Sequence, residues 1–210
     1  MTNLQYSLAE NRGLLHIGGA DAAEFLQGMI SNDIHLVTPE NSVYAALLTP
    51  QGKFLFDFIM LDDGDGGLLL DTSRERLPEL AKRLGFYKLR AKADIRDLSD
   101  ELKVTVLIGD NAAKTVKLHS GPGNAWRVGA DCYAVDPRLA ALGVRCIHPV
   151  GDDPLAAHAE GTLDDYAAHR MALAVPEGGT DVLIDKSFIL ESNFEELNAV
   201  DFEKGCYVGQ

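Results

Sequence analysis

Short apolar runs separated by turn-forming residues dominate the first half of the chain. Residues 43–49 and 54–61 form two such runs, and Pro50-Gln51-Gly52-Lys53 between them is typical of the turn of a β-hairpin. Further short apolar runs predict strands at 14–17, 68–70, 93–98, 102–108, 126–128, 132–135 and 144–147.

Helical spacing of apolar residues follows three candidate capping residues, Asp21, Thr72 and Thr162. Each stands three positions before an acidic residue, which is the spacing of a capping box. We expect helices to begin at these caps, the last of them running to about Val175 before Pro176, and a shorter helix over 111–118. Strands that form hairpins and alternate with helices predict an α+β fold.

Composition excludes several classes of protein. A hydrophobic share of 46% over 210 residues is enough for a buried core. No apolar run approaches the roughly 20 residues of a membrane helix, so we expect no membrane partner. The first ten residues contain no Lys or Arg, which argues against a secretory signal or a basic transit peptide. Three widely spaced cysteines indicate the reducing cytoplasm and no metal site.

The net charge of −13 argues against direct binding of nucleic acid. One basic cluster stands out, at Lys82, Arg83, Lys88, Arg90 and Lys92. We interpret this cluster as the solvated end of a helix and the loop after it.

The last seven residues, Lys204 to Gln210, carry the most specific chemistry, Lys-Gly-Cys-Tyr-Val-Gly-Gln. Glycines on both sides of Cys206 let other backbone approach the thiol closely, and Lys204 lies two positions before it. This setting favours a reactive or ligand-contacting cysteine. A structural cysteine in a tight turn is the alternative, and the residues alone leave both open.

The same seven residues resemble the signature K-G-C-Y-x-G-Q-E of the YgfZ-type proteins, in the superfamily of the glycine-cleavage T-protein, an aminomethyltransferase. Four further segments resemble this family's motifs. They are 25–33 (FLQGMISND), 48–53 with Asp57, 136–139 (DPRL) with Arg145, and 166–170 with 176–177. The sequence ends before the Glu of the signature and without the small C-terminal barrel of the family.

The resemblance implies a T-protein-like folate-binding fold with modules around a central hole. We expect a folate-binding N-terminal module over 1–98, a second α+β module over 99–160, and a segment over 161–210 that returns to the folate-binding core. The implied function is binding of tetrahydrofolate, or a one-carbon derivative, by a protein that assists assembly or repair of iron–sulfur proteins, including those that modify tRNA. Its implied partners are iron–sulfur assembly or client proteins. A one-carbon transfer enzyme and a non-catalytic scaffold are the alternatives.

The resemblance also suggests functions for the strand residues Phe56 and Asp57. A carboxylate between Phe56 and Phe58 could meet the N–H donors of a pterin, with Phe56 adding apolar surface. Asp57 would then be the acid/base of any transfer chemistry, alongside the functional Cys206. Alternation along a strand equally permits Asp57 to face outward.

Other expected folate contacts come from the last third of the chain. Arg170 would meet the glutamate tail of folate or an internal carboxylate. Glu191 and Asn193 belong to a segment that the family places near the central hole, and the signature adds Lys204 and Tyr207.

Overall fold

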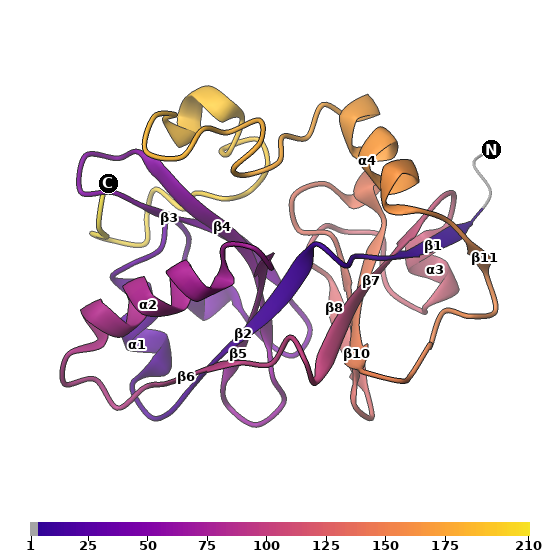
Figure 1. Cartoon of the computed structure of the whole chain (residues 1–210), viewed down its shortest axis with the longest axis horizontal. Helices are drawn as coiled ribbons and strands as arrows, with labels where there is room; N and C mark the ends of the chain where they lie inside the picture. The colour runs from indigo at the N-terminus through magenta and orange to yellow at the C-terminus, as the bar shows by residue number, and fades with distance from the viewer. Residues whose placement is uncertain (1–3) are drawn as a thin grey trace.

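The computed structural model describes residues 4–210 and contains two β-sheets that lie side by side (Figure 1). The first sheet is antiparallel throughout, in the order β3-β4-β5-β2-β6. Its strands are β3 (Val43–Leu48), β4 (Phe54–Asp62), β5 (Leu68–Ser73), β2 (Arg12–Gly18) and β6 (Asp94–Asp97).

The second sheet has the order β11-β1-β7-β10-β9-β8. Its strands are β11 (Ala159–Glu160), β1 (Gln5–Leu8), β7 (Leu102–Ile108), β10 (Val144–Pro149), β9 (Asp131–Val135) and β8 (Ala125–Val128). Among the paired strands of residues 4–210, only the short β1–β11 pair is parallel. The mixed architecture with antiparallel hairpins confirms the predicted α+β class.

The predicted hairpin is formed by β3 and β4, in which Ala46 pairs with Asp57. Both strands are buried along almost their whole length, because each of their faces packs against a hydrophobic core. Burial on both faces explains why the sequence shows continuous apolar runs here rather than alternation.

Of the three predicted capping residues, only Thr162 caps a helix through its side chain. Helix α4 (Leu163–Ala172) begins with the predicted capping box, in which the Thr162 hydroxyl accepts from the backbone N–H of Asp165 and the Asp165 carboxylate accepts from that of Thr162. It ends three residues before the expected position, and α3 is also short (Ala112–Thr115).

Asp21 and Thr72 do not cap helices through their side chains. Helix α2 (Leu77–Lys88) begins after Arg76, because Thr72 continues β5 and donates its hydroxyl to the Asp57 carbonyl of the neighbouring strand. Helix α1 (Ala22–Gln27) does follow Asp21, but the Asp21 carboxylate accepts from the backbone N–H of Lys92. Contacts from distant segments thus override both local capping signals.

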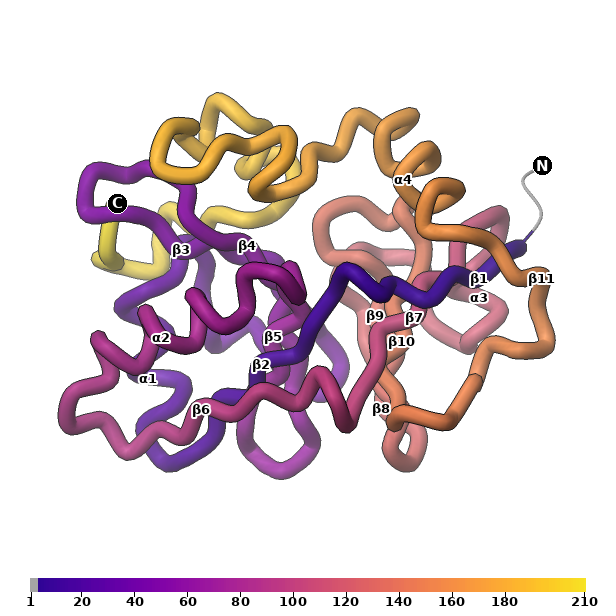
Figure 2. The backbone as a smooth tube through the Cα atoms, viewed as in Figure 1, coloured from indigo at the N-terminus to yellow at the C-terminus, as the bar shows by residue number. Residues whose placement is uncertain are grey.

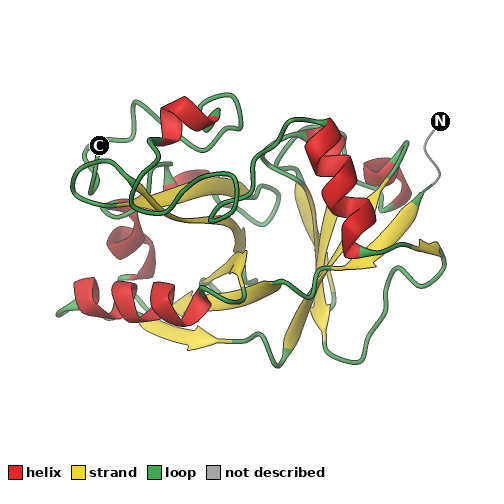
Figure 3. Ribbon diagram, turned by 45° about the horizontal axis from the view of Figure 1, so that its top comes forward, coloured by secondary structure: helices red, strands yellow, loops and turns green. Residues whose placement is uncertain are grey.

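The chain passes from the first sheet to the second close to residue 98, between β6 and β7. The exception is β1, which comes before the strands of the first sheet but pairs with β7 in the second. Helix α4 packs beside β1. After α4, the chain returns across the first sheet to the β3–β4 hairpin, mostly as loops and turns (Figures 2 and 3). Its one regular element is the 3₁₀ turn η3 (Ile189–Ser192), and within residues 4–210 no helix is long and apolar enough to cross a membrane.

Candidate functional site

Three of the motif segments meet at the C-terminal end of the described chain. Residues 204–210 lie against the end of α1 and against the turn of the β3–β4 hairpin, and we call this assembly the thiol platform. The Lys204 ammonium donates to the carbonyl oxygens of Gln27 at 2.5 Å and Ile30 at 2.7 Å. Two residues beyond Cys206, the backbone N–H of Val208 donates to the Gly28 carbonyl at 3.1 Å. The thiol therefore lies between two anchored points.

The glycine of the signature at position 209 is required by the platform. Gly209 has a φ of +86°, and an added Cβ would overlap the carbonyl oxygen of Thr49. Across the contact Gly52 also has a positive φ, and its Cβ position lies 3.1 Å from the Gly209 carbonyl oxygen. Two turns without side chains thus let residues 204–210 pack directly against the hairpin.

Cys206 differs from the other two cysteines in its exposure. Cys132 and Cys146 are buried, and burial raises the pKa of both thiols, whereas Cys206 is exposed. Cys206 is therefore the one thiol of the chain that a partner or ligand can reach. Residues 4–210 contain no group of three or more His, Cys, Asp or Glu side chains able to hold a metal ion. A single cysteine supplies one ligand of a metal or cluster.

Beside the platform lies a groove of about 460 Å³ with a largely apolar lining. Tyr207 and Glu191 line it, together with the exposed apolar side chains of Phe188, Leu190 and Phe202. The Lys53 ammonium lies 3.9 Å from the centre of the Phe188 ring, a cation–π contact at the rim. Cys206 does not line this groove, but its neighbours Tyr207 and Gly209 do.

A second hollow of about 370 Å³ shares Glu191 with the groove. Its lining brings together Arg170, Glu191 and Asn193, three of the predicted folate contacts. The Arg170 guanidinium is already paired with internal carboxylates, at 3.0 Å from Asp181 and 3.4 Å from Glu177. Arg170 was expected to meet either the glutamate tail of folate or an internal carboxylate. In the structure its guanidinium pairs with internal carboxylates.

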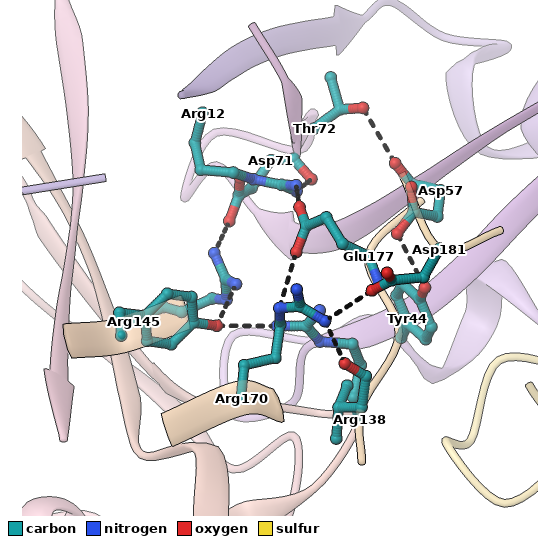
Figure 4. A network of polar contacts seen from close by, with 12 residues as sticks. Arg12, Tyr44, Asp57, Asp71, Thr72, Arg138, Arg145, Arg170, Glu177 and Asp181 are labelled. Carbon is teal, nitrogen blue, oxygen red and sulfur yellow. Dashed lines mark hydrogen bonds and ion pairs between the residues drawn. The ribbon is translucent and has the colours of Figure 1, made fainter. Parts of the chain in front are cut away.

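Buried charged side chains connect the two sheets (Figure 4). Arg145 on β10 lies 2.5 Å from the Asp71 carboxylate on β5, and 3.0 Å from that of Asp136. Arg138 makes a bidentate pair with Asp136, at 2.9 and 2.8 Å. Burial alone would raise the pKa of Asp136, but Arg138 and Arg145 hold this pKa well below its ordinary value. The network therefore joins the two sheets through buried ion pairs.

Asp57 lies at the edge of this network and is buried. Its carboxylate accepts one side-chain hydrogen bond, from the Tyr44 hydroxyl at 2.8 Å. Burial raises the pKa of Asp57, and the charge of Arg12 only partly offsets this effect. Gly178 covers the carboxylate so closely that an added Cβ would overlap one carboxylate oxygen. Asp57 therefore faces inward, which rules out the outward-facing alternative.

Two other predicted folate contacts point away from this carboxylate. Phe56 belongs to the core on the opposite face of β4, where the Arg76 guanidinium lies 4.2 Å from its ring centre. Phe56 and Asp57 consequently cannot contact the same face of one pterin. The Lys204 ammonium faces the end of α1, which gives it an anchoring role on the platform.

Sequence reasoning missed Arg12, Asp71 and Tyr44 as members of the network. Arg12 donates to the Asp71 carboxylate at 2.6 Å, and both side chains are buried. A signal for Asp71 was present, since a single charge directly follows the apolar run 68–70 of a predicted strand. Such a charge inside a core needs a partner, but nothing local identifies Arg12 and Arg145 as the partners.

Comparison with a solved structure identifies the fold. The aminomethyltransferase T of the glycine cleavage system from Bartonella henselae superposes with a TM-score of 0.63 and 16% identity, covering 74% of this chain and 45% of that chain. The chain has the T-protein fold. This result confirms the fold class that the motifs suggested.

No protein-family model matches the chain. Curated proteins, however, are similar to it over its whole length. The iron-sulfur cluster assembly factor IBA57 homolog, mitochondrial, of Mycosarcoma maydis is 32% identical over 225 residues, which cover 100% of this chain and 53% of the relative. The iron-sulfur cluster assembly factor IBA57, mitochondrial, of Mus musculus is 32% identical over 218 residues, with 96% and 59% covered. The chain spans a little over half the length of these relatives.

The expected cytoplasmic location is wrong, because these relatives are named as mitochondrial proteins. The inference rested on the odd number of cysteines and on the lack of a recognisable signal or transit peptide in the first ten residues. An odd number of free thiols reports a reducing environment, and that property does not single out the cytoplasm.

Proposed function

We propose that this T-protein-fold chain assists the assembly or repair of iron–sulfur proteins, with Cys206 as its functional thiol. The main observation behind this proposal is that three motif segments build one platform, which presents the only exposed thiol of residues 4–210. The whole-chain similarity to iron–sulfur cluster assembly factors supports the same conclusion.

The chemistry available to Cys206 is that of one thiolate ligand. Iron–sulfur clusters are commonly held by several cysteine thiolates, so Cys206 acts together with ligands from a partner or a small thiol. The cluster is then cargo that passes across the exposed platform to a client protein. A link to tRNA modification would be indirect, through iron–sulfur enzymes that modify tRNA.

Tetrahydrofolate is the small molecule that we propose for the groove beside the platform. Tyr207 and Phe188 offer aromatic surface to a planar ring, and the Glu191 carboxylate can accept from the N–H donors of a pterin. Asn193 in the adjoining hollow can meet the glutamate tail, whereas the Arg170 guanidinium beside it is already paired with Asp181 and Glu177. One-carbon transfer is less well supported, because its candidate acid/base Asp57 is covered by Gly178.

The test of the thiol is complementation of a strain that lacks the gene, with Cys206→Ser and with Glu203→Ala as a control on the same exposed segment. We expect Cys206→Ser to lose most of the activity of the iron–sulfur enzymes that depend on the protein, and Glu203→Ala to retain it. Full activity with Cys206→Ser would reject a functional thiol.

Calorimetric titration with tetrahydrofolate tests the folate part separately. Glu191→Gln and Tyr207→Ala should each weaken binding by about tenfold, the effect of losing one charge-assisted hydrogen bond or one aromatic contact. Asp57→Asn should leave the affinity unchanged. Loss of binding in Asp57→Asn alone would place the pterin at Asp57, and absence of saturable heat would reject folate binding.

A further inference from the structure

The end of α2 forms an exposed apolar tip, which the proposed function does not use. Phe86 is 81% exposed and Leu89 is 87% exposed, the two highest values among the large apolar side chains of residues 4–210. The loop that follows, between α2 and β6, lies at one extremity of the molecule, at the far left of Figures 1 and 2. The tip is therefore exposed at one end of the molecule.

Leu89 occupies this tip in a strained backbone conformation. It is the residue that ends α2, with a φ of +43°. Glycine is the usual residue where a helix ends with positive φ, because a side chain there crowds the following carbonyl. A leucine that is both strained and exposed gains nothing from packing. Strain of this kind often marks a functional position.

Five cations lie close to the two apolar side chains in the sequence. The eleven residues 82–92 contain five of the 19 Lys and Arg of the chain, at Lys82, Arg83, Lys88, Arg90 and Lys92. Within the described part of the chain, none of their side chains forms an ion pair.

The carboxylates nearest the tip are already occupied. Glu79 pairs with Arg76, and Asp94 pairs with Arg96. A third carboxylate, Asp21, accepts from the backbone N–H of Lys92. The tip is consequently a local positive surface on a molecule with a net charge of −13.

Two open hollows lie on either side of Phe86. One, of about 380 Å³, is lined by Lys82, Arg83 and Tyr87 along with Glu79. The other, of about 730 Å³, is lined by Gly85, Lys88 and Leu89 among others. Each combines apolar side chains with cations, which suits a ligand that has an anionic head and an apolar body.

We propose that this tip binds the surface of an anionic lipid membrane. Phe86 and Leu89 would enter the boundary between headgroups and acyl chains, while the five cations meet lipid phosphates. This mode needs no spanning segment. It therefore revises the expectation of no membrane partner, which rested only on the lack of a long apolar run.

Shape and charge favour a lipid surface over nucleic acid or an acidic protein. Phe86 has an aromatic face that can stack on a base as well as enter lipid, but the aliphatic Leu89 has none and enters lipid readily. A contact at one extremity keeps most of the acidic molecule more than a Debye length, about 8 Å at physiological salt, from the anionic surface.

Vesicle co-sedimentation of the full chain tests this proposal. We expect binding to vesicles of equal parts phosphatidylcholine and phosphatidylglycerol, little binding to phosphatidylcholine alone, and weakening by salt. The variant Phe86→Ser/Leu89→Gly and the variant Lys88→Glu/Arg90→Glu should each lose at least about tenfold in affinity. Matched controls are Val128→Ser/Val150→Ser and Lys114→Glu/Lys117→Glu, exposed positions of the second module, which should bind as the parent does.

The single variant Leu89→Gly separates a lipid contact from a folding effect. Glycine tolerates the positive φ, so this variant should melt at the same or a higher temperature while it binds vesicles more weakly. Full vesicle binding by Leu89→Gly would overturn the proposal, as would equal binding to neutral vesicles. Binding of poly(U) RNA or polyglutamate without any binding of vesicles would overturn it in favour of those partners.

Discussion

Asp57 and Asp136 are both buried acids, yet their surroundings give them opposite effects on stability. Asp136 has two arginine partners, which lower its pKa, whereas Asp57 has one neutral hydroxyl partner and a raised pKa. A lowered pKa stabilises the fold above the ordinary pKa of the acid, and this stabilisation is lost as the pH falls through the folded-state value. A raised pKa has the reverse effect, with stability lost as the pH rises through the folded-state value.

At the scale of this residue we predict that Asp57→Asn stabilises the protein at neutral pH. Asparagine mimics the protonated acid and can still accept from the Tyr44 hydroxyl, so the burial of an ionised group is avoided. The free energy of unfolding in urea should exceed that of the parent at pH 7. The difference should shrink as the pH falls below the ordinary pKa of Asp, near 3.8. A less stable Asp57→Asn at pH 7 would contradict a raised pKa.

At the scale of the element, residues 204–210 have no regular structure of their own and depend on contacts with the rest of the chain. The Lys204 ammonium makes two of these contacts, at the carbonyl-rich end of α1, where a cation is favoured. Burial lowers the pKa of Lys204, and Asp33 and Asp201 act against this effect. The segment is therefore held by a few strong anchors.

We predict that Lys204→Met detaches this segment without unfolding the protein. Each lost hydrogen bond to a charged donor contributes about 1.5–3 kcal/mol, which is enough to open the segment locally. Hydrogen exchange at the amide of Val208, which donates to Gly28, should accelerate by at least about tenfold. Lys114→Met, at an exposed position, is the control. Unchanged exchange at Val208 would show that Lys204 is not an anchor.

At the scale of the whole molecule, the polar network connects two sheets that have separate strand orders. Arg145 is the link, because it reaches Asp71 in the first sheet from β10 in the second. It also donates to the hydroxyl of Tyr166 on α4 at 3.1 Å. We therefore expect cooperative folding of the two sheets to depend on these buried groups.

We predict that Arg145→Met lowers the free energy of unfolding by about 3–5 kcal/mol, since it leaves two buried carboxylates each short of one partner. Arg74→Met removes an exposed pair with Asp100 and should change the free energy by less than about 1 kcal/mol. Urea unfolding followed by circular dichroism measures both. An Arg145→Met protein as stable as the parent would exclude the network as the link between the sheets.

Local signals identified the elements whose causes lie within a few residues. The β3–β4 hairpin follows from two apolar runs around a turn, and the Thr162 cap follows from a carboxylate three positions later. Thr72 shows the same spacing and caps nothing, because its hydroxyl is taken by the Asp57 carbonyl of the neighbouring strand. A pattern of this length carries no information about a competing partner in another strand.

The sequence by itself determined the α+β class, the hairpin and the glycine-flanked thiol of Cys206, because each is a property of neighbouring residues. Only the tertiary structure decided that Asp57 faces inward beneath Gly178, and that Arg170 pairs with Asp181 and Glu177. It alone brought residues 204–210 against α1 and the hairpin. These outcomes depend on groups far apart in the chain, whose distances are set by how the two sheets and the returning segment pack.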